Sequence, residues 1–256
     1  MELKNNLLDV KEFPYVVRFL NLPKLLDLLI SEKLYFSRLD SFKDKSEAIS
    51  HQQLIKLLYP KIFFVSPKKE MDLEKRQRSY FATCWFGSKR ESFAMWNLYS
   101  DSSSVAIKYK LRNFNKLWEL NNIEFDCDSD WINRIFIDKM IYKDYLNEKE
   151  ITKDTRHGIM GLYKDQSYSD EKEVRVLIKC KGRITQGKQK LTWEEQNVNA
   201  IKLALVNLKD VPFEILFHPE MKETHKRNIE DLVKKYNFQN VECKDSELSK
   251  LFISKK

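Results

Sequence analysis

The spacing of apolar and polar residues predicts short strands that alternate with amphipathic helices. The densest aromatic segment, FATCWFGSKRESFAMWNLYSDSSSVAIKY at 81–109, predicts a strand, a helix and a second strand. Residues 81–86 are apolar or β-branched at nearly every position, which is typical of a buried strand. Ser88 and Glu91 have the spacing of a capping box, so we predict that the helix begins at Ser88, and residues 104–109 alternate as a strand does.

The rest of the chain shows the same two periods. We predict strands at 15–20, 34–38, 131–143, 167–179, 213–217 and 241–243. We predict helices at 22–31, at 48–59, within 111–125 with an end near Asn121, and at 221–236. Residues 60–78 and the basic stretch 182–192 have the composition of loops. The helix at 221–236 predicts a crossover between the two strands that flank it.

These elements predict an α+β fold in which helices flank a mixed, largely antiparallel split β-sheet. Of the 256 residues, 42% are hydrophobic and 12% aromatic, which is enough for a sizeable core. The chain has only 5 Gly and 6 Pro, so no glycine-rich linker divides it. We therefore expect a single domain over residues 1–256, in which residues 198–256 form a structural αβ section.

Composition narrows the class of protein further. No apolar run approaches the roughly 20 residues of a membrane-spanning helix, and the polar start lacks a signal peptide's apolar stretch, so we expect a cytoplasmic protein with no membrane partner. Cys84, Cys127, Cys180 and Cys243 are far apart, which argues against a zinc site or a disulfide scaffold, and we expect no metal. The net charge of +8 favours an anionic partner such as nucleic acid, but lysine is spread along the whole chain and compositional bias also explains it.

The candidate chemistry lies on the predicted strand 167–179. Its period of two places Glu171, Glu173 and Arg175 on one face, so two carboxylates and a guanidinium line up. An exposed edge strand whose charges prevent aggregation has the same pattern. Another charge, Arg18, lies on an otherwise apolar strand and requires an anionic partner, either a protein carboxylate or a ligand phosphate.

Four blocks of the sequence resemble the bacterial domain-of-unknown-function family 2971. The first is YVVRFLNLPKLLDLLISEKLYFSRLDSF at 15–42, followed by two acids, and the second is CWFGSKRESFAMWNLYS at 84–100 with VAIKYK after it. The third is the E-x-E-x-R strand, and the fourth is the closing strand, proline and helix with the tail DSEL at 245–248. Lys45-Ser46 replaces the family's usual Pro-Phe.

That family in turn resembles the ADP-ribosyltransferases, including toxins that modify DNA and RNA. The resemblance implies an ADP-ribosyltransferase-like fold, NAD as the substrate, and a nucleic acid or protein as the acceptor. It also implies a toxin or antiphage effector, with a partner protein that neutralises it. Under this resemblance Glu173 stabilises the cationic ribose and Glu171 acts as general base, while the NAD-binding set is Arg18, Ser37, Arg38, Tyr35, Trp96 and Tyr99.

The transferase hypothesis requires Arg18 and Glu173, which are distant in sequence, to meet at an open groove. Two other functions fit the same residues. A non-catalytic module on a degenerate transferase fold would bind nucleic acid or protein through the basic surface. A metal-dependent hydrolase would use Asp40, Asp44 and Glu47, although no histidine lies near them in the sequence.

Overall fold

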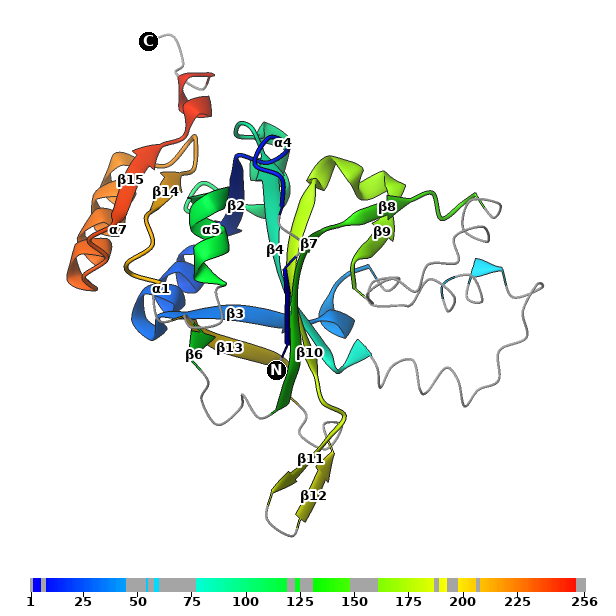
Figure 1. Ribbon diagram of the computed structural model, residues 1–256. Coiled ribbons are helices and arrows are strands. Elements are labelled where there is room, and N and C mark those ends of the chain that lie inside the picture. The colour runs from blue at the N-terminus through cyan, green and yellow to red at the C-terminus, as the bar shows by residue number, and fades with distance from the viewer. Residues whose placement is uncertain are drawn as a thin grey trace. The chain divides into compact units, whose positions relative to one another are not determined.

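The structure is a computed structural model that describes residues 2–5, 8–44, 54, 58–59, 77–118, 123–124, 131–147, 161–186, 189–192, 198–205 and 208–251 (Figure 1). These residues form a mixed α/β fold in which most strand pairings are antiparallel, as expected. They fall into two compact units. Unit 1 comprises Met1–Asn6, Tyr35–Cys84 and Phe125–Lys202, and unit 2 comprises Leu7–Leu34, Trp85–Glu124 and Leu203–Lys256. Most of the predicted helix 48–59 and loop 60–78 lies outside the described residues.

Unit 1 is based on strands, most of which pair in antiparallel fashion. Its strands are β1 (Glu2–Asn5), β3 (Lys33–Arg38), β4 (Tyr80–Ser88), β7 (Ile132–Lys139), β8 (Ile141–Lys143), β9 (Tyr163–Asp165), β10 (Glu173–Cys180), β11 (Arg183–Gln186) and β12 (Gln189–Thr192), with the 3-10 helices η1 (Leu39–Ser41) and η4 (Gln166–Glu171). β7 pairs in parallel with β1 and antiparallel with β10, β4 neighbours β10, and β3 pairs antiparallel with β4. The pairs β8–β9 and β11–β12 form two small sheets.

Among the described residues, unit 2 contains four α-helices and its own set of strands. They are β2 (Tyr15–Leu20), α1 (Leu22–Ser31), α4 (Phe93–Tyr99), β5 (Val105–Lys110), α5 (Leu111–Leu117), β6 (Ile123–Glu124), β13 (Ala200–Leu205), β14 (Phe213–Phe217), α7 (Glu223–Lys235), β15 (Val241–Asp245) and the 3-10 helix η6 (Glu247–Leu251). β3 begins and β4 ends in this unit, and β13 begins in unit 1. β2 pairs antiparallel with β4 and β5, β5 pairs antiparallel with β14, and β14 pairs in parallel with β15, while β13 pairs with β6.

Several predicted elements are confirmed. α1 has the predicted bounds: the side chain of Asn21 accepts a hydrogen bond from the backbone N–H of Lys24 at the start, and Leu25, Leu28 and Leu29 form its buried stripe. The crossover is also confirmed, because α7 joins β14 to β15 and these strands pair in parallel from Phe213 and Val241 onward. No helix in the described part of the chain is long and apolar enough to cross a membrane.

The predicted capping box at Ser88 and Glu91 is wrong. β4 continues through Ser88, which pairs with Tyr15 of β2, so the ladder occupies the position where the cap was expected. α4 begins after Ser92, whose side-chain oxygen accepts a hydrogen bond from the N–H of Met95. The spacing rule found a real helix and placed its start four residues early, because pairing with β2 outweighs a local cap.

The single strand predicted at 167–179 is also wrong. Residues 166–171 form η4, Lys172 has a left-handed φ of 41°, and β10 begins only at Glu173. Glu171 is therefore not a same-face strand neighbour of Glu173. Two smaller predictions also differ from the structure. Residues 182–192 contain the hairpin β11–β12 where a loop was expected, and α5 ends at Leu117, before the predicted end of that helix.

Candidate functional site

A buried cluster of charged side chains lies in unit 1 at the start of β10. The Nε of Arg175 donates a hydrogen bond of 2.6 Å to Oε1 of Glu173, and its Nη1 donates one of 2.7 Å to the carbonyl of Gly161. Arg175 is 0% exposed and Glu173 is 5% exposed. Both residues are thus internal, which rules out the alternative of an exposed edge strand for this pair.

Lys164 of β9 joins the two acids of the E-x-E motif. Its Nζ lies 2.6 Å from Oε2 of Glu171 and 3.6 Å from Oε2 of Glu173, and it also lies over the ring of Tyr168. Glu171 comes from η4 and Glu173 from β10, so the lysine, and not a shared strand face, brings the two carboxylates together. No periodic pattern in the sequence points to Lys164, and its role in this cluster was not predicted.

The surroundings favour an ionised carboxylate at Glu173. Burial by itself raises the pKa of Glu173, but the charge of Arg175, its hydrogen bond and the charge of Lys164 outweigh burial, so the pKa lies below its ordinary value. The N–H of Glu173 donates to the hydroxyl of Tyr142, and burial raises the pKa of Tyr142 to about 12. At neutral pH the cluster therefore holds a carboxylate beside a protonated phenol.

Unit 1 places Ser37 on the same face as Glu173. Ser37 of β3 is the cross-strand partner of Ala82 of β4, and such partners share a face of the sheet. Ala82 packs with Leu177, which lies two positions along β10 from Arg175 on the face of Glu173. Of the predicted NAD-binding set, Ser37 therefore lies on the side of the acid cluster, and the alternation of β3 places Tyr35 on the same face of that strand.

Arg38 contacts other groups of unit 1, and Tyr35 is partly exposed to solvent. The guanidinium of Arg38 donates to Asp40 at 2.6 Å and to the carbonyl of Val198 at 2.9 Å, so protein acceptors take up its Nε and Nη1. Tyr35 is 37% exposed. Asp40 also lies 3.8 Å from Arg78, while Glu47 of the hydrolase hypothesis lies outside the described residues. In the described residues no group of three or more His, Cys, Asp and Glu side chains could hold a metal ion.

In unit 2, β2 separates the remaining predicted NAD-binding residues. Arg18 lies over the ring of Trp85 at 5.9 Å. Trp96 packs instead in the cluster that contains Val17, and Val17 directly precedes Arg18 on β2 and so points to the opposite face. Tyr99 is 48% exposed and stacks on Phe19, on the same face as Trp96. Arg18 and Trp96 thus lie on opposite faces of this strand, an arrangement that does not fit one dinucleotide held by both.

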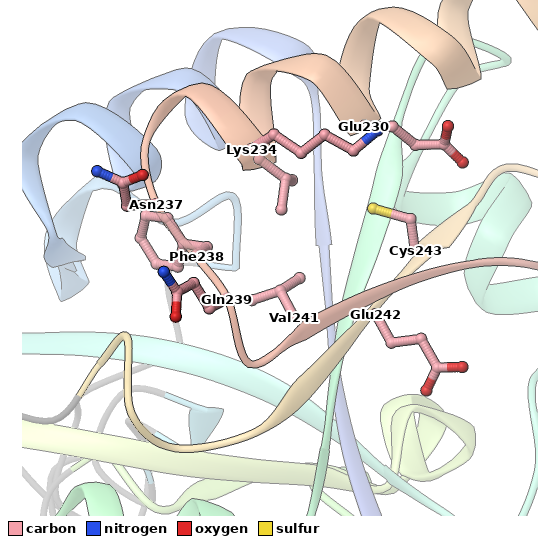
Figure 2. Close-up of a pocket in the computed structure, with 9 residues that line it drawn as sticks. Glu230, Lys234, Asn237, Phe238, Gln239, Val241, Glu242 and Cys243 are labelled. Atoms are coloured by element: carbon pink, nitrogen blue, oxygen red, sulfur yellow. The ribbon is translucent and has the colours of Figure 1, made fainter.

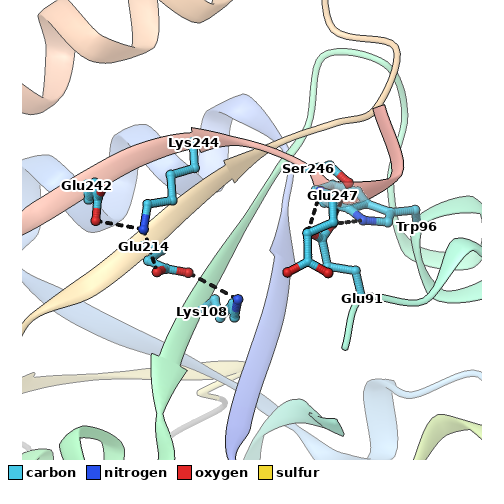
Figure 3. A network of polar contacts seen from close by, with 8 residues as sticks. All are labelled: Glu91, Trp96, Lys108, Glu214, Glu242, Lys244, Ser246 and Glu247. Atoms are coloured by element: carbon cyan, nitrogen blue, oxygen red, sulfur yellow. Dashed lines mark hydrogen bonds and ion pairs between the residues drawn. The ribbon is translucent and has the colours of Figure 1, made fainter. Parts of the chain in front are cut away.

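Glu91 organises a polar network that we did not predict. Its Oε2 accepts hydrogen bonds from the Nε1 of Trp96 at 3.1 Å and from the hydroxyl of Ser246, and its Oε1 accepts one of 2.8 Å from the N–H of Glu247 (Figure 3). Glu91 therefore connects the turn before α4 to the tail after β15. Glu91 and Ser246 belong to two of the four sequence blocks, 84–100 and 245–248, on which the predicted resemblance rests.

A basic groove of about 300 Å³ opens in unit 2 beside the end of β5. Lys108 and Lys110 alternate along β5 onto one face, Tyr15 is the cross-strand partner of Lys110, and Arg112 follows in the first turn of α5. Lys108 is held in place: its Nζ lies 3.2 Å from Glu214 and 4.3 Å from the centre of the Tyr15 ring.

Two acids moderate the positive charge of this groove. Lys244 pairs with Glu214 and Glu242, both at 2.8 Å, so Glu214 bridges Lys108 and Lys244 (Figure 3). Burial raises the pKa of Glu214, but its hydrogen bonds to the two lysines outweigh burial and the net shift is downward. Lys110 and Arg112 are both exposed and form no ion pair with any described residue. They are the cations of this groove that an anionic ligand would meet.

No known protein family, curated protein or solved structure matches this chain. The resemblance to family 2971 and to ADP-ribosyltransferases therefore stays a prediction, as does the meeting of Arg18, in unit 2, with Glu173, in unit 1.

Proposed function

We propose that this protein binds single-stranded nucleic acid through the basic groove of unit 2. The observation that supports this function is the exposed pair Lys110 and Arg112 beside Tyr15, at the rim of a groove whose other lysine is fixed by Glu214. Binding without sequence preference needs cations that follow the phosphate backbone and an aromatic face on which a base stacks. Tyr15 lines the groove, and because Lys108 covers one face of its ring, a base would stack on the other face. The net charge of +8 attracts the polyanion.

The two acids beside the groove limit the affinity for nucleic acid that we expect. Glu214 and Glu242 lie next to the lysines, so the local excess of positive charge is small and contact with phosphates rests mainly on Lys110 and Arg112. We therefore expect affinity in the range of non-specific binding, with a Kd of about 10⁻⁴ to 10⁻⁶ M at physiological salt. Binding should show little preference for sequence, because no part of this proposal involves the edges of the bases.

Fluorescence anisotropy with labelled single-stranded RNA and DNA of mixed sequence, at several salt concentrations, tests this function. Each phosphate contact contributes about −0.7 to the slope of log K against log salt for single strands. The double variant Lys110→Ala/Arg112→Ala should reduce the steepness of that slope by about 1.4. The control Lys24→Ala/Lys222→Ala removes the same charge from exposed positions on α1 and before α7 and should leave the slope close to wild type. Equal losses in the two double variants would refute the groove as the binding site.

The transferase hypothesis remains a second candidate, supported by the cluster at β10. Lys164 holds Glu171 and Glu173 together, Ser37 lies on the same face, and the low pKa of Glu173 keeps that carboxylate ionised, as stabilising a cationic ribose requires. This candidate includes the ADP-ribosyltransferase-like arrangement of the sheet and NAD as substrate. Because Glu173 is only 5% exposed, a substrate could touch it only after the side chains that cover it move.

Release of nicotinamide from NAD, with nucleic acid or a protein mixture as acceptor, tests this second candidate. The expected result is release by the wild type and at least a hundredfold less by Glu171→Gln and Glu173→Gln, the usual scale for a general base or an electrostatic stabiliser. Circular dichroism shows whether each variant still folds. Absence of nicotinamide release by folded wild-type protein, together with salt-dependent binding of nucleic acid, would leave the binding function alone.

A further inference from the structure

The outer edge of β15 is an open strand edge in the described part of the chain. β15 pairs with β14 along Val241–Asp245, and no other described strand pairs with it. The N–H of Phe213 donates to the carbonyl of Asn240, which sets the parallel ladder. In that ladder Glu242 and Lys244 turn their backbone groups toward β14, so Cys243 turns its N–H and C=O toward the open edge.

The side chains of this edge are complementary to themselves. Glu242 and Lys244 are 67% and 40% exposed, pair with each other at 2.8 Å within the chain, and flank Cys243 symmetrically with opposite charges, so the dimer exchanges this pair for two between copies. An antiparallel pairing of two such strands about Cys243 places Glu242 of each copy opposite Lys244 of the other, twice for each dimer. A twofold axis generates this arrangement, because a twofold interface sets one surface against itself.

Next to this edge lies an open groove of about 560 Å³. Figure 2 shows Glu230 and Lys234 of α7 on one side of it and Val241 and Cys243 of β15 on the other. The groove thus contains apolar side chains together with one acid and one base from the helix. A second copy that extends the sheet would carry its own α7 on the same face, where it would lie along this groove.

We propose that a second copy of this chain binds at this edge, through antiparallel pairing of the two β15 strands about Cys243. Charge complementarity selects this occupant: an unrelated extended peptide would need its own Lys-x-Glu or Glu-x-Lys spacing, which the chain itself already carries. The interaction extends the sheet from each copy and covers the groove beside α7. It requires neither Lys110 nor Arg112, the cations of the nucleic-acid site, which lie on β5 and α5, although Glu242 lines that groove as well.

Two measurements test this interface. Light scattering after gel filtration should show a dimer that dissociates on dilution. Glu242→Lys should weaken it about tenfold or more, because lysine then faces Lys244 twice. Glu220→Lys makes the same charge change at an exposed position outside β15 and should leave the dimer intact. A wild-type monomer at every concentration, or equal weakening by both variants, would overturn the proposal.

Oxidative trapping tests the register. Directly opposed, hydrogen-bonded residues of an antiparallel pair have Cα atoms about 5.5 Å apart, within the range that a disulfide spans. Burial raises the pKa of Cys243 to about 11, so trapping belongs at alkaline pH, where the thiolate forms. Mild oxidation should give a covalent dimer that Cys243→Ser abolishes and Cys127→Ser retains. A covalent dimer that persists in Cys243→Ser would refute this register.

Discussion

Glu173→Gln is the most informative change for the charged cluster of unit 1. The variant keeps the shape of the side chain and removes the charge that Arg175 faces at 2.6 Å and Lys164 faces at 3.6 Å. Arg175 is wholly buried, and its guanidinium would then lose the charged partner that it contacts at 2.6 Å. Removing one partner of a buried ion pair costs about 3–5 kcal/mol. At about 2–4 °C per kcal/mol for a chain of this size, Tm should fall by about 6–20 °C.

Thermal and urea unfolding, followed by circular dichroism, measure the loss. Asp245→Asn is the matched control: it breaks the 2.6 Å ion pair with Lys226, in which the acid is 60% exposed, and should cost no more than about 1 kcal/mol. The double variant Glu173→Gln/Arg175→Met removes both charges and should be more stable than Glu173→Gln alone. If Glu173→Gln is as stable as the control, the conclusion that the charge of Glu173 stabilises the buried charges of Arg175 and Lys164 is wrong.

The same cluster predicts how stability varies with pH. The pKa of Glu173 in the folded chain lies below the ordinary value of 4.5, as Arg175 and Lys164 outweigh burial. Its contribution to stability is therefore fully present above the unfolded-state pKa and is lost as the pH falls through the folded-state pKa. Urea titrations from neutral to acid pH should show a larger decrease for the wild type than for Glu173→Gln. Parallel curves for the two proteins would contradict this account.

Three further changes test local features. Gly161→Ala should cost about 1–3 kcal/mol of stability in a thermal melt, because φ is +89° and the added Cβ would lie 2.8 Å from a leucine methyl. Gly182→Ala is the control and should be neutral, because a Cβ added there would have no atom within 4 Å. Asn21→Ala should cost about 1 kcal/mol by loss of the α1 cap, and an unchanged Tm would show that the cap is replaced by water. Glu91→Ala should cost about 1–3 kcal/mol and shift tryptophan emission, since Nε1 of buried Trp96 loses its acceptor; unchanged emission would contradict that contact.

The sequence was sufficient where one local pattern dominates. α1 has the predicted bounds, because Asn21, Pro23 and a leucine stripe act within one stretch of chain. The β14–α7–β15 crossover followed from two apolar strands separated by a helix of suitable length, which leaves few ways to connect them. α1 depends on residues that are close in sequence, and the crossover depends on a single helix that joins two neighbouring strands.

Contacts between distant segments decided the rest. Ser88 could not cap a helix because its backbone pairs with β2, more than seventy positions earlier in the chain. The E-x-E motif predicted two acids on one strand, but Glu171 lies in η4 and reaches its neighbour only through Lys164. The sequence allowed Arg18 and Trp96 to be assigned to one site, because it does not show on which face of β2 each side chain lies. The structure places them on opposite faces. Local periodicity determines which side of an element is apolar, whereas which elements meet, and with them the surroundings of every charge, is settled only by packing.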